Sequence, residues 1–174
     1  MVGDGLSVAR ASLLAMRSVF WAALLPGVVA GYVPWRYFGL HQMPLDLLRL
    51  NQAVGLASVG LGAVLLAACI VEFARAGRGT LAPVDAPRVL VVRGLYRYVR
   101  NPMYLSVTCI VLGEALMAQS RPLLVYWAAF FAAANLFVVG YEEPALRRRF
   151  GASYTQYAGR VGRWVPRFRA KALQ

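Results

Sequence analysis

Residues 101–141 read NPMYLSVTCIVLGEALMAQSRPLLVYWAAFFAAANLFVVGY and carry only two charged side chains, Glu114 and Arg121. Arg121 divides the stretch into two apolar runs of about 20 residues. A helix of that length crosses the ~30 Å hydrocarbon core of a bilayer. Because about two residues separate the runs, they are predicted to form an antiparallel hairpin of transmembrane helices. The start of the first run and the end of the second are therefore expected to lie side by side.

Two further apolar runs lie upstream, at residues 18–35 and 50–71. Together with the hairpin runs at 101–120 and 122–141 they predict four membrane spans and an all-α integral membrane fold. The composition agrees, since 60% of the 174 residues are hydrophobic and 15% are charged, against roughly 45–50% and 25% in soluble domains. Residues 1–174 are expected to form a single domain. The composition excludes an ordinary soluble globule, a disordered chain and a disulfide scaffold.

Basic residues are distributed unevenly around the four runs. The chain has 19 Lys and Arg against 7 Asp and Glu, a net charge of +12. With both termini in the cytoplasm, 16 basic residues lie inside and three outside, as the positive-inside rule requires. Most of them fall in a loop at residues 75–100 and a tail at residues 142–174. The expected partner is the anionic lipid of a bacterial inner membrane and not nucleic acid, because nucleic-acid-binding proteins lack long uncharged runs.

The first span and the tail carry patterns of their own. Gly27 and Gly31 form a small-xxx-small pair at which another helix is expected to approach closely. In the tail, Pro144 can begin a helix, since proline is favoured at the first helical position. Apolar side chains then recur at helical spacing with arginines between them, which predicts an amphipathic helix lying in the membrane interface. These side chains are Leu146, Phe150, Tyr154 and Tyr157.

Arg100-Asn101-Pro102 marks the expected start of the third span. Asn is a good N-cap, and Pro suits the first helical position. A helix start offers free N–H groups to an anion, and Arg100 adds a bidentate donor. The alternative interpretation is a capped helix with a basic collar beside the lipid headgroups and no ligand.

Two acidic residues, Glu142 and Glu143, follow the fourth span. Carboxylates at the C-terminal end of a helix oppose its dipole, so they need a partner such as Arg147 or a new helix beginning at Pro144. Because the hairpin brings its two ends together, these acids are expected to face Arg100. A basic helix start opposite two carboxylates suits a zwitterionic cofactor that also carries hydroxyl groups.

Glu114 is the one acidic residue inside a span. It lies roughly 20 Å from the start of the third span at 1.5 Å per residue. A carboxyl group at that depth is costly and indicates a function, unless it is close enough to the outer surface to be hydrated. The sequence leaves both interpretations open.

An ordered set of motifs fills the C-terminal half of the chain. Its segments are Gly94-x-Tyr96-x-x-x-Arg100-Asn101-Pro102-x-Tyr104-x-Ser106, Glu142-Glu143-Pro144-x-Leu146, Phe150-Gly151-x-x-Tyr154-x-x-Tyr157 and Val161-Gly162-Arg163-Trp164-Val165-Pro166. Over about residues 75–168 this set resembles the isoprenylcysteine carboxyl methyltransferase and phospholipid methyltransferase family. The cofactor pocket of that family uses an Arg-His-Pro-x-Tyr-x-Gly motif and a Glu-Glu motif. In this chain Asn101 replaces the histidine and Ser106 replaces the glycine.

The resemblance implies a polytopic membrane enzyme that transfers a methyl group from S-adenosylmethionine and uses no metal. The absence of a G-x-G-x-x-G motif after a strand separately excludes a soluble Rossmann methyltransferase. By the same resemblance Arg100 and Glu142 are the expected catalytic residues. The cofactor-binding residues that it implies are Tyr96, Arg100, Asn101, Pro102, Tyr104, Ser106, Glu142 and Glu143.

Three functions remain open. The first is methylation of a lipophilic carboxylate of the isoprenylcysteine type, which the tail motif favours. The second is N-methylation of phosphatidylethanolamine or S-methylation of a small thiol, and the third is a non-catalytic membrane subunit with the same fold. The acceptor is expected to arrive through the bilayer, between the second or third span and the tail helix. Only about 60 residues lie outside the bilayer on that side, too few to enclose a separate substrate domain.

Overall fold

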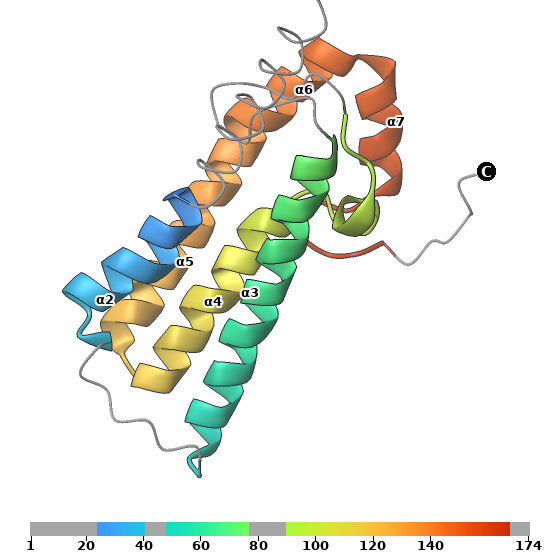
Figure 1. The fold of residues 1–174 in the computed structure, drawn as a ribbon. Helices are drawn as coiled ribbons and strands as arrows, with labels where there is room; N and C mark the ends of the chain where they lie inside the picture. Colours follow the sequence, from blue (N-terminus) through green and yellow to red (C-terminus); the bar gives the residue numbers. More distant parts are fainter. Residues whose placement is uncertain (1–23, 41–47, 77–89, 168–174) are drawn as a thin grey trace, which may run out of the picture.

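The chain folds into a bundle of helices (Figure 1). This computed structural model describes residues 24–40, 48–76 and 90–167. Within them every regular element is a helix, and an isolated β-bridge joins Val99 to Gly162. The elements are the π-helix η1 (Val28–Tyr32), α2 (Val33–Tyr37), α3 (Leu50–Ala76), the 3-10 helix η3 (Gly94–Arg97), α4 (Pro102–Ala118), α5 (Arg121–Phe137), the π-helix η4 (Val138–Glu142), α6 (Glu143–Phe150) and α7 (Ala152–Arg160).

Two helices are long and apolar enough to cross a membrane, Leu50–Glu72 and Arg121–Phe150. The helix between them in the sequence, Pro102–Ala118, is apolar but shorter. The all-helical fold with apolar helices of this length agrees with the expected class of membrane protein. The expected first span at residues 18–35 lies partly outside the described residues, and the number of four spans stays a prediction.

α3 and α4 lie against each other through their glycines. A Cβ atom added at Gly55 would lie 2.6 Å from the carbonyl oxygen of Gly113. One added at Gly62 would lie 2.6 Å from the carbonyl oxygen of Ser106. Glycine lets two backbones approach this closely, as is usual between helices in membranes.

The close approach expected at Gly27 and Gly31 is wrong for the part of the chain that the structure describes. A Cβ atom at either position would meet no described atom within 4 Å, and both residues are exposed. Their spacing marks a face of the first helix that the described helices leave uncovered.

α4 and α5 form the expected antiparallel hairpin, joined by Gln119 and Ser120. Gln119 ends α4 in the left-handed region, with φ of 47°. Ser120 caps α5, since its Oγ accepts a hydrogen bond from the N–H of Leu123 at 3.3 Å. The first helix, residues 24–37, packs against this hairpin. The buried core between them consists of Ala30, Val107, Val111, Ala115 and Leu123.

Each π-helix is followed by a proline, Pro34 after η1 and Pro144 after η4. Proline has no N–H to donate, and its ring crowds the preceding turn of a helix. A π turn widens the helix at that point, so the helix can continue past the proline. The helix of α5 therefore continues through η4 and α6 to Phe150 (Figure 1). The helix thus runs past Tyr141, the expected end of the fourth span, and Pro144 does not begin a separate helix. Where the span itself ends stays a prediction.

The structure differs from the expected loop at residues 75–100 and from the expected tail in where α3 ends and in how many helices the tail contains. α3 runs past residue 71 to Ala76, and part of the loop lies outside the described residues. The tail contains two helices instead of one, because Gly151 with φ of 52° turns the chain between α6 and α7. α7 consequently leaves the axis of α6 and runs back toward η3 (Figure 1).

Candidate functional site

A cavity of about 410 Å³ lies at the end of the bundle where α4 begins and η4 leads into α6. Its walls come from the first helix, the segment before α4, α4 itself, and the helices from α5 to α7. α3 contributes no lining residue among those that the structure describes. The polar part of the lining consists of Tyr96, Arg100, Asn101, Tyr104, Glu142, Glu143, Tyr154 and Tyr157. Deeper in the bundle the lining is apolar and includes Val29, Val107, Phe130, Ala134 and Phe137.

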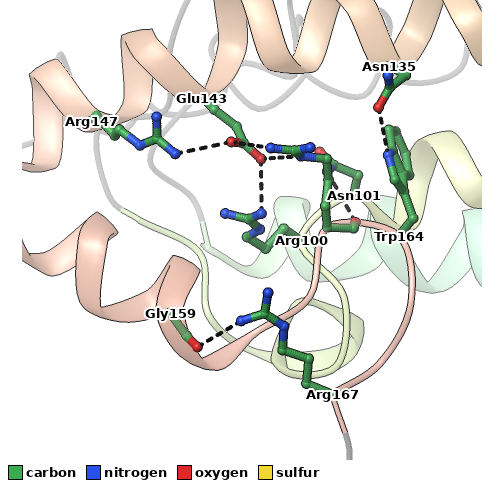
Figure 2. A network of polar contacts seen from close by, with 9 residues as sticks. Arg100, Asn101, Asn135, Glu143, Arg147, Gly159, Trp164 and Arg167 are labelled. Carbon is green, nitrogen blue, oxygen red and sulfur yellow. Dashed lines mark hydrogen bonds and ion pairs between the residues drawn. The ribbon is translucent and has the colours of Figure 1, made fainter.

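Glu143 is the centre of a cluster of arginines and is only 3% exposed (Figure 2). Arg163 donates to both of its carboxylate oxygens, from Nε at 2.7 Å and from Nη2 at 2.9 Å. Arg100 contacts Oε1 at 3.1 Å, and Arg147 contacts Oε2 at 3.4 Å. Both oxygens of Glu143 are therefore occupied by protein donors, and its charge is balanced within the fold.

Arg100 has donors left over. Its Nη2 contacts Glu143, whereas its Nε is buried and has no hydrogen-bond acceptor in the described part of the chain. A buried N–H without an acceptor costs about 1–3 kcal/mol. Arg100 also lines the cavity, so its guanidinium is a candidate partner for an anionic group bound there.

Glu142 differs from its neighbour. The Oη of Tyr104 donates a hydrogen bond to Oε2 of Glu142 at 3.2 Å, and both side chains line the cavity. The described residues provide Glu142 with no ion pair. Its carboxylate can therefore accept hydrogen bonds from hydroxyl or amino groups of a ligand.

Residues 161–165 hold the start of α4 in place and are called the strap. The N–H of Arg100 donates to the carbonyl oxygen of Gly162 at 2.8 Å, and Nδ2 of Asn101 donates to that of Arg163 at 3.2 Å. Asn101 is at the expected N-cap position, but its side chain makes no capping hydrogen bond and faces the strap instead. Trp164 fastens the strap to α5 through a hydrogen bond from its Nε1 to Oδ1 of Asn135 at 2.9 Å (Figure 2).

Three tyrosines join α7 to the segment around η3. The Oη of Tyr157 donates to the carbonyl oxygen of Tyr96 at 2.7 Å, and the rings of Tyr154 and Tyr157 lie 6.1 Å apart edge to face. Burial raises the pKa of the Tyr96, Tyr154 and Tyr157 hydroxyls above the usual value. These hydroxyls consequently stay protonated at alkaline pH values where a free tyrosine loses its proton.

The structure gathers most of the residues that the sequence indicated. Tyr96, Arg100, Asn101, Tyr104, Glu142 and Glu143 line the cavity. Pro102 and Ser106 are buried and do not line it, and the Oγ of Ser106 donates to the carbonyl oxygen of Pro102 at 2.7 Å.

Some positions were missed or lie elsewhere. Glu114 is buried in α4 and does not line the cavity. Arg163, which binds Glu143, was not expected in the site, and its place in the C-terminal motif was the available signal. Among the described residues, no group of three or more His, Cys, Asp and Glu side chains is arranged to hold a metal ion.

Membrane-length apolar helices and a cavity that changes from polar to apolar define a membrane-type helical protein with an internal cavity. Residues 50–153 match the family model described as phospholipid methyltransferase. The match spans more than half of the chain, which therefore belongs to the phospholipid methyltransferase family. This confirms the family resemblance and, with it, a protein of the membrane methyltransferase type. No curated protein and no solved structure matches the chain.

Proposed function

We propose that this protein is an integral membrane methyltransferase that uses S-adenosylmethionine to methylate a lipophilic acceptor. The observation that carries the proposal is the cavity, in which Arg100 and Glu142 at one end are continuous with an apolar lining at the other. A polar methyl donor and an apolar acceptor chain can occupy these two parts together. Both termini and the polar end are assigned to the cytoplasm, from which the donor is supplied.

The polar end fits the chemistry of the methyl donor. S-adenosylmethionine carries a carboxylate, an amine, ribose hydroxyls and a sulfonium cation, and when bound it supplies the methyl group. The guanidinium of Arg100 lines the cavity and suits the carboxylate. Glu142 suits the amine or the hydroxyls, and the ring of Tyr104 can face the cation.

Glu142 and Glu143 are assigned different tasks. Glu142 lines the cavity, and among the described residues only Tyr104 engages its carboxylate, so we assign it to ligand contact. Glu143 holds Arg100 while Arg163 and Arg147 balance its charge, so it acts as a positioning residue. This assignment leaves Arg100 and Glu142 as the residues at the reacting end.

A carboxylate acceptor requires the least from these residues. A carboxyl group with a pKa of about 3.5 is already ionised at neutral pH. The protein then has only to align the carboxylate with the methyl carbon and exclude water. An amine or a small thiol, the alternative acceptors, would first have to lose a proton, for which Glu142 is the nearest candidate base.

The cavity lining suggests a further route for the acceptor that the sequence did not indicate. The lining includes the third expected span as α4, but no described residue of α3, the second. Leu25, Pro26 and Val29 of the first helix line it instead, opposite Phe130 of α5. We assign the acceptor's path to the space between the first helix and α5.

The test is methyl transfer by the purified protein in nanodiscs. Methyl-labelled S-adenosylmethionine and a bacterial lipid extract are supplied, and mass spectrometry identifies the labelled product. Glu142→Gln is expected to slow transfer at limiting donor concentration, whereas Arg148→Gln, a change of an exposed residue away from the cavity, leaves the rate unchanged. Binding of S-adenosylhomocysteine without transfer to any lipid would favour the non-catalytic subunit, and no binding would contradict the proposal.

A further inference from the structure

One face of α5 and η4 follows the cavity along its length. Phe130, Ala134, Phe137 and Tyr141 recur at helical spacing, and all of them line the cavity. The next residue on this face, one turn beyond Phe130, is Tyr126, which does not line it. The cavity therefore ends between Phe130 and Tyr126.

The hydroxyl of Tyr126 closes the gap between α5 and the first helix. It donates a hydrogen bond to the carbonyl oxygen of Val29 at 2.9 Å, and Val29 lines the cavity. The Tyr126 ring also packs on Phe38, with centroids 5.4 Å apart. These contacts join the two helices immediately below the apolar end of the cavity.

The Val29 carbonyl is available because of Pro34. In the π-helix η1 each N–H donates to the carbonyl oxygen five residues earlier, and the N–H of Val33 donates to the carbonyl oxygen of Val28. In the same register, the next donor would be residue 34, a proline without an N–H. A carbonyl left without a donor in apolar surroundings is costly, and Tyr126 supplies the missing hydrogen bond.

We propose that the Tyr126–Val29 contact is the floor of a channel for the acceptor's apolar chain and sets the longest chain that fits. This inference rests on the proposed function, because it places the reacting group of the acceptor at the polar end. The occupant is a lipid-like molecule, since the channel leads from Glu142 into a lining of apolar side chains. Along α5 and η4, the distance from Glu142 to Phe130 is about 18 Å at 1.5 Å per residue.

Binding across a series of chain lengths tests the floor independently of turnover. The protein in nanodiscs is loaded with a fluorescent polyene fatty acid, which is displaced by n-alkyl carboxylates of increasing length, and each affinity is referred to the free aqueous concentration of the carboxylate. In the parent protein, the apparent affinity is expected to rise up to about fourfold per methylene and then to stop rising. In Tyr126→Ala the rise should continue for roughly four more carbons, the length of a ~5.4 Å helical turn.

Two further variants make the result decisive. Leu136→Ala is the matched control, because Leu136 is 72% exposed on α5 and lies outside the cavity lining, and it should keep the parental limit. Tyr126→Phe removes only the hydrogen bond to Val29 and should raise the affinity for chains beyond that limit, even if Tyr126→Ala fails to fold.

The outcomes separate the floor from the proposed function. If the affinity of the parent protein kept rising with chain length, the proposal that Tyr126 forms the floor would be contradicted. It would also be contradicted if neither Tyr126 variant changed the chain length at which the affinity stops rising. Methyl transfer to the same carboxylates is measured in parallel. A protein with the expected length limit but no transfer to any acceptor would contradict the proposed function and leave the floor standing.

Discussion

Adjacent carboxylates in this protein have opposite surroundings. Glu143 is 3% exposed, and three arginines contact its two oxygens. Glu142 accepts a hydrogen bond from Tyr104 and lines the cavity. A charge balanced inside the fold contributes to its integrity, whereas a charge left at a cavity is available to a ligand. Substitutions at the two positions should therefore have different effects.

Glu143→Gln is expected to destabilise the fold, and Glu142→Gln is expected to weaken ligand binding. Removing Glu143 leaves Arg100, whose side chain is 9% exposed, without its counter-charge, which costs about 3 kcal/mol of unfolding free energy. Removing the charge of Glu142 should weaken S-adenosylhomocysteine binding roughly tenfold and leave the melting temperature nearly unchanged. Thermal unfolding in detergent measures the effect on stability, and calorimetry measures the effect on binding. Identical behaviour of the two variants would contradict the different roles assigned to Glu142 and Glu143.

The buried tyrosines predict a loss of stability at alkaline pH. Burial raises the pKa of Tyr157 above its unfolded value of about 10. The unfolded chain then releases the proton first, so the stabilisation is complete below pH ~10 and is lost as the pH rises through the folded pKa. Tyr157→Phe should lower the melting temperature at neutral pH, through loss of about 1 kcal/mol from its hydrogen bond to Tyr96. It should also flatten the alkaline decline, and an unchanged slope would exclude Tyr157 as its cause.

At the scale of the elements, Gly113 determines how closely α3 and α4 approach. A Cβ atom there would lie 2.5 Å from the carbonyl oxygen of Gly55 and 2.8 Å from Cγ2 of Val59. Gly113→Ala should therefore destabilise the protein by about 1–3 kcal/mol, although alanine is the better helix former. Gly60→Ala is the control, because a Cβ there meets no described atom within 4 Å, and it should be neutral or stabilise by up to ~1 kcal/mol. Equal stability of the two variants in thermal unfolding would contradict the close approach.

The α4–α5 hairpin could be predicted from the sequence because its signals are local. The lengths of the apolar runs and the polar break around Arg121 determine both helices and their connection. The path beyond residue 141 could not be predicted in the same way. Pro144 ordinarily signals a helix boundary, and the π turn of η4 that carries the helix past it depends on the packing around it.

The candidate site was likewise predictable only in part. Arg100 and Glu143 meet because an antiparallel hairpin must bring its ends together. The contact of Asn101 with the strap spans 62 residues of sequence, and no local pattern contains it. A good N-cap residue therefore occupies the predicted position but directs its side chain toward Arg163.

At the scale of the whole molecule, the polar groups of the site lie together at one end of the bundle. The cavity, η3, α7 and the strap all lie near the start of α4, whereas α2 lies near the α4–α5 connection at the other end (Figure 1). The basic residues follow the same division, with 16 expected on the side of the site and three on the other. Arg97 in η3 lies at the end that holds the cavity, and Arg36 in α2 lies at the opposite end.

This division predicts that the end holding the cavity faces the cytoplasm. Arg36→Cys and Arg97→Cys place a thiol at each end, and both arginines are exposed. A membrane-impermeant maleimide should label Arg36→Cys in intact spheroplasts and Arg97→Cys only after permeabilisation. The parent protein controls for its own thiols, of which Cys69 is buried and Cys109 is half-buried. Labelling of both variants from outside, or the reverse pattern, would contradict the assignment of the cavity end to the cytoplasm.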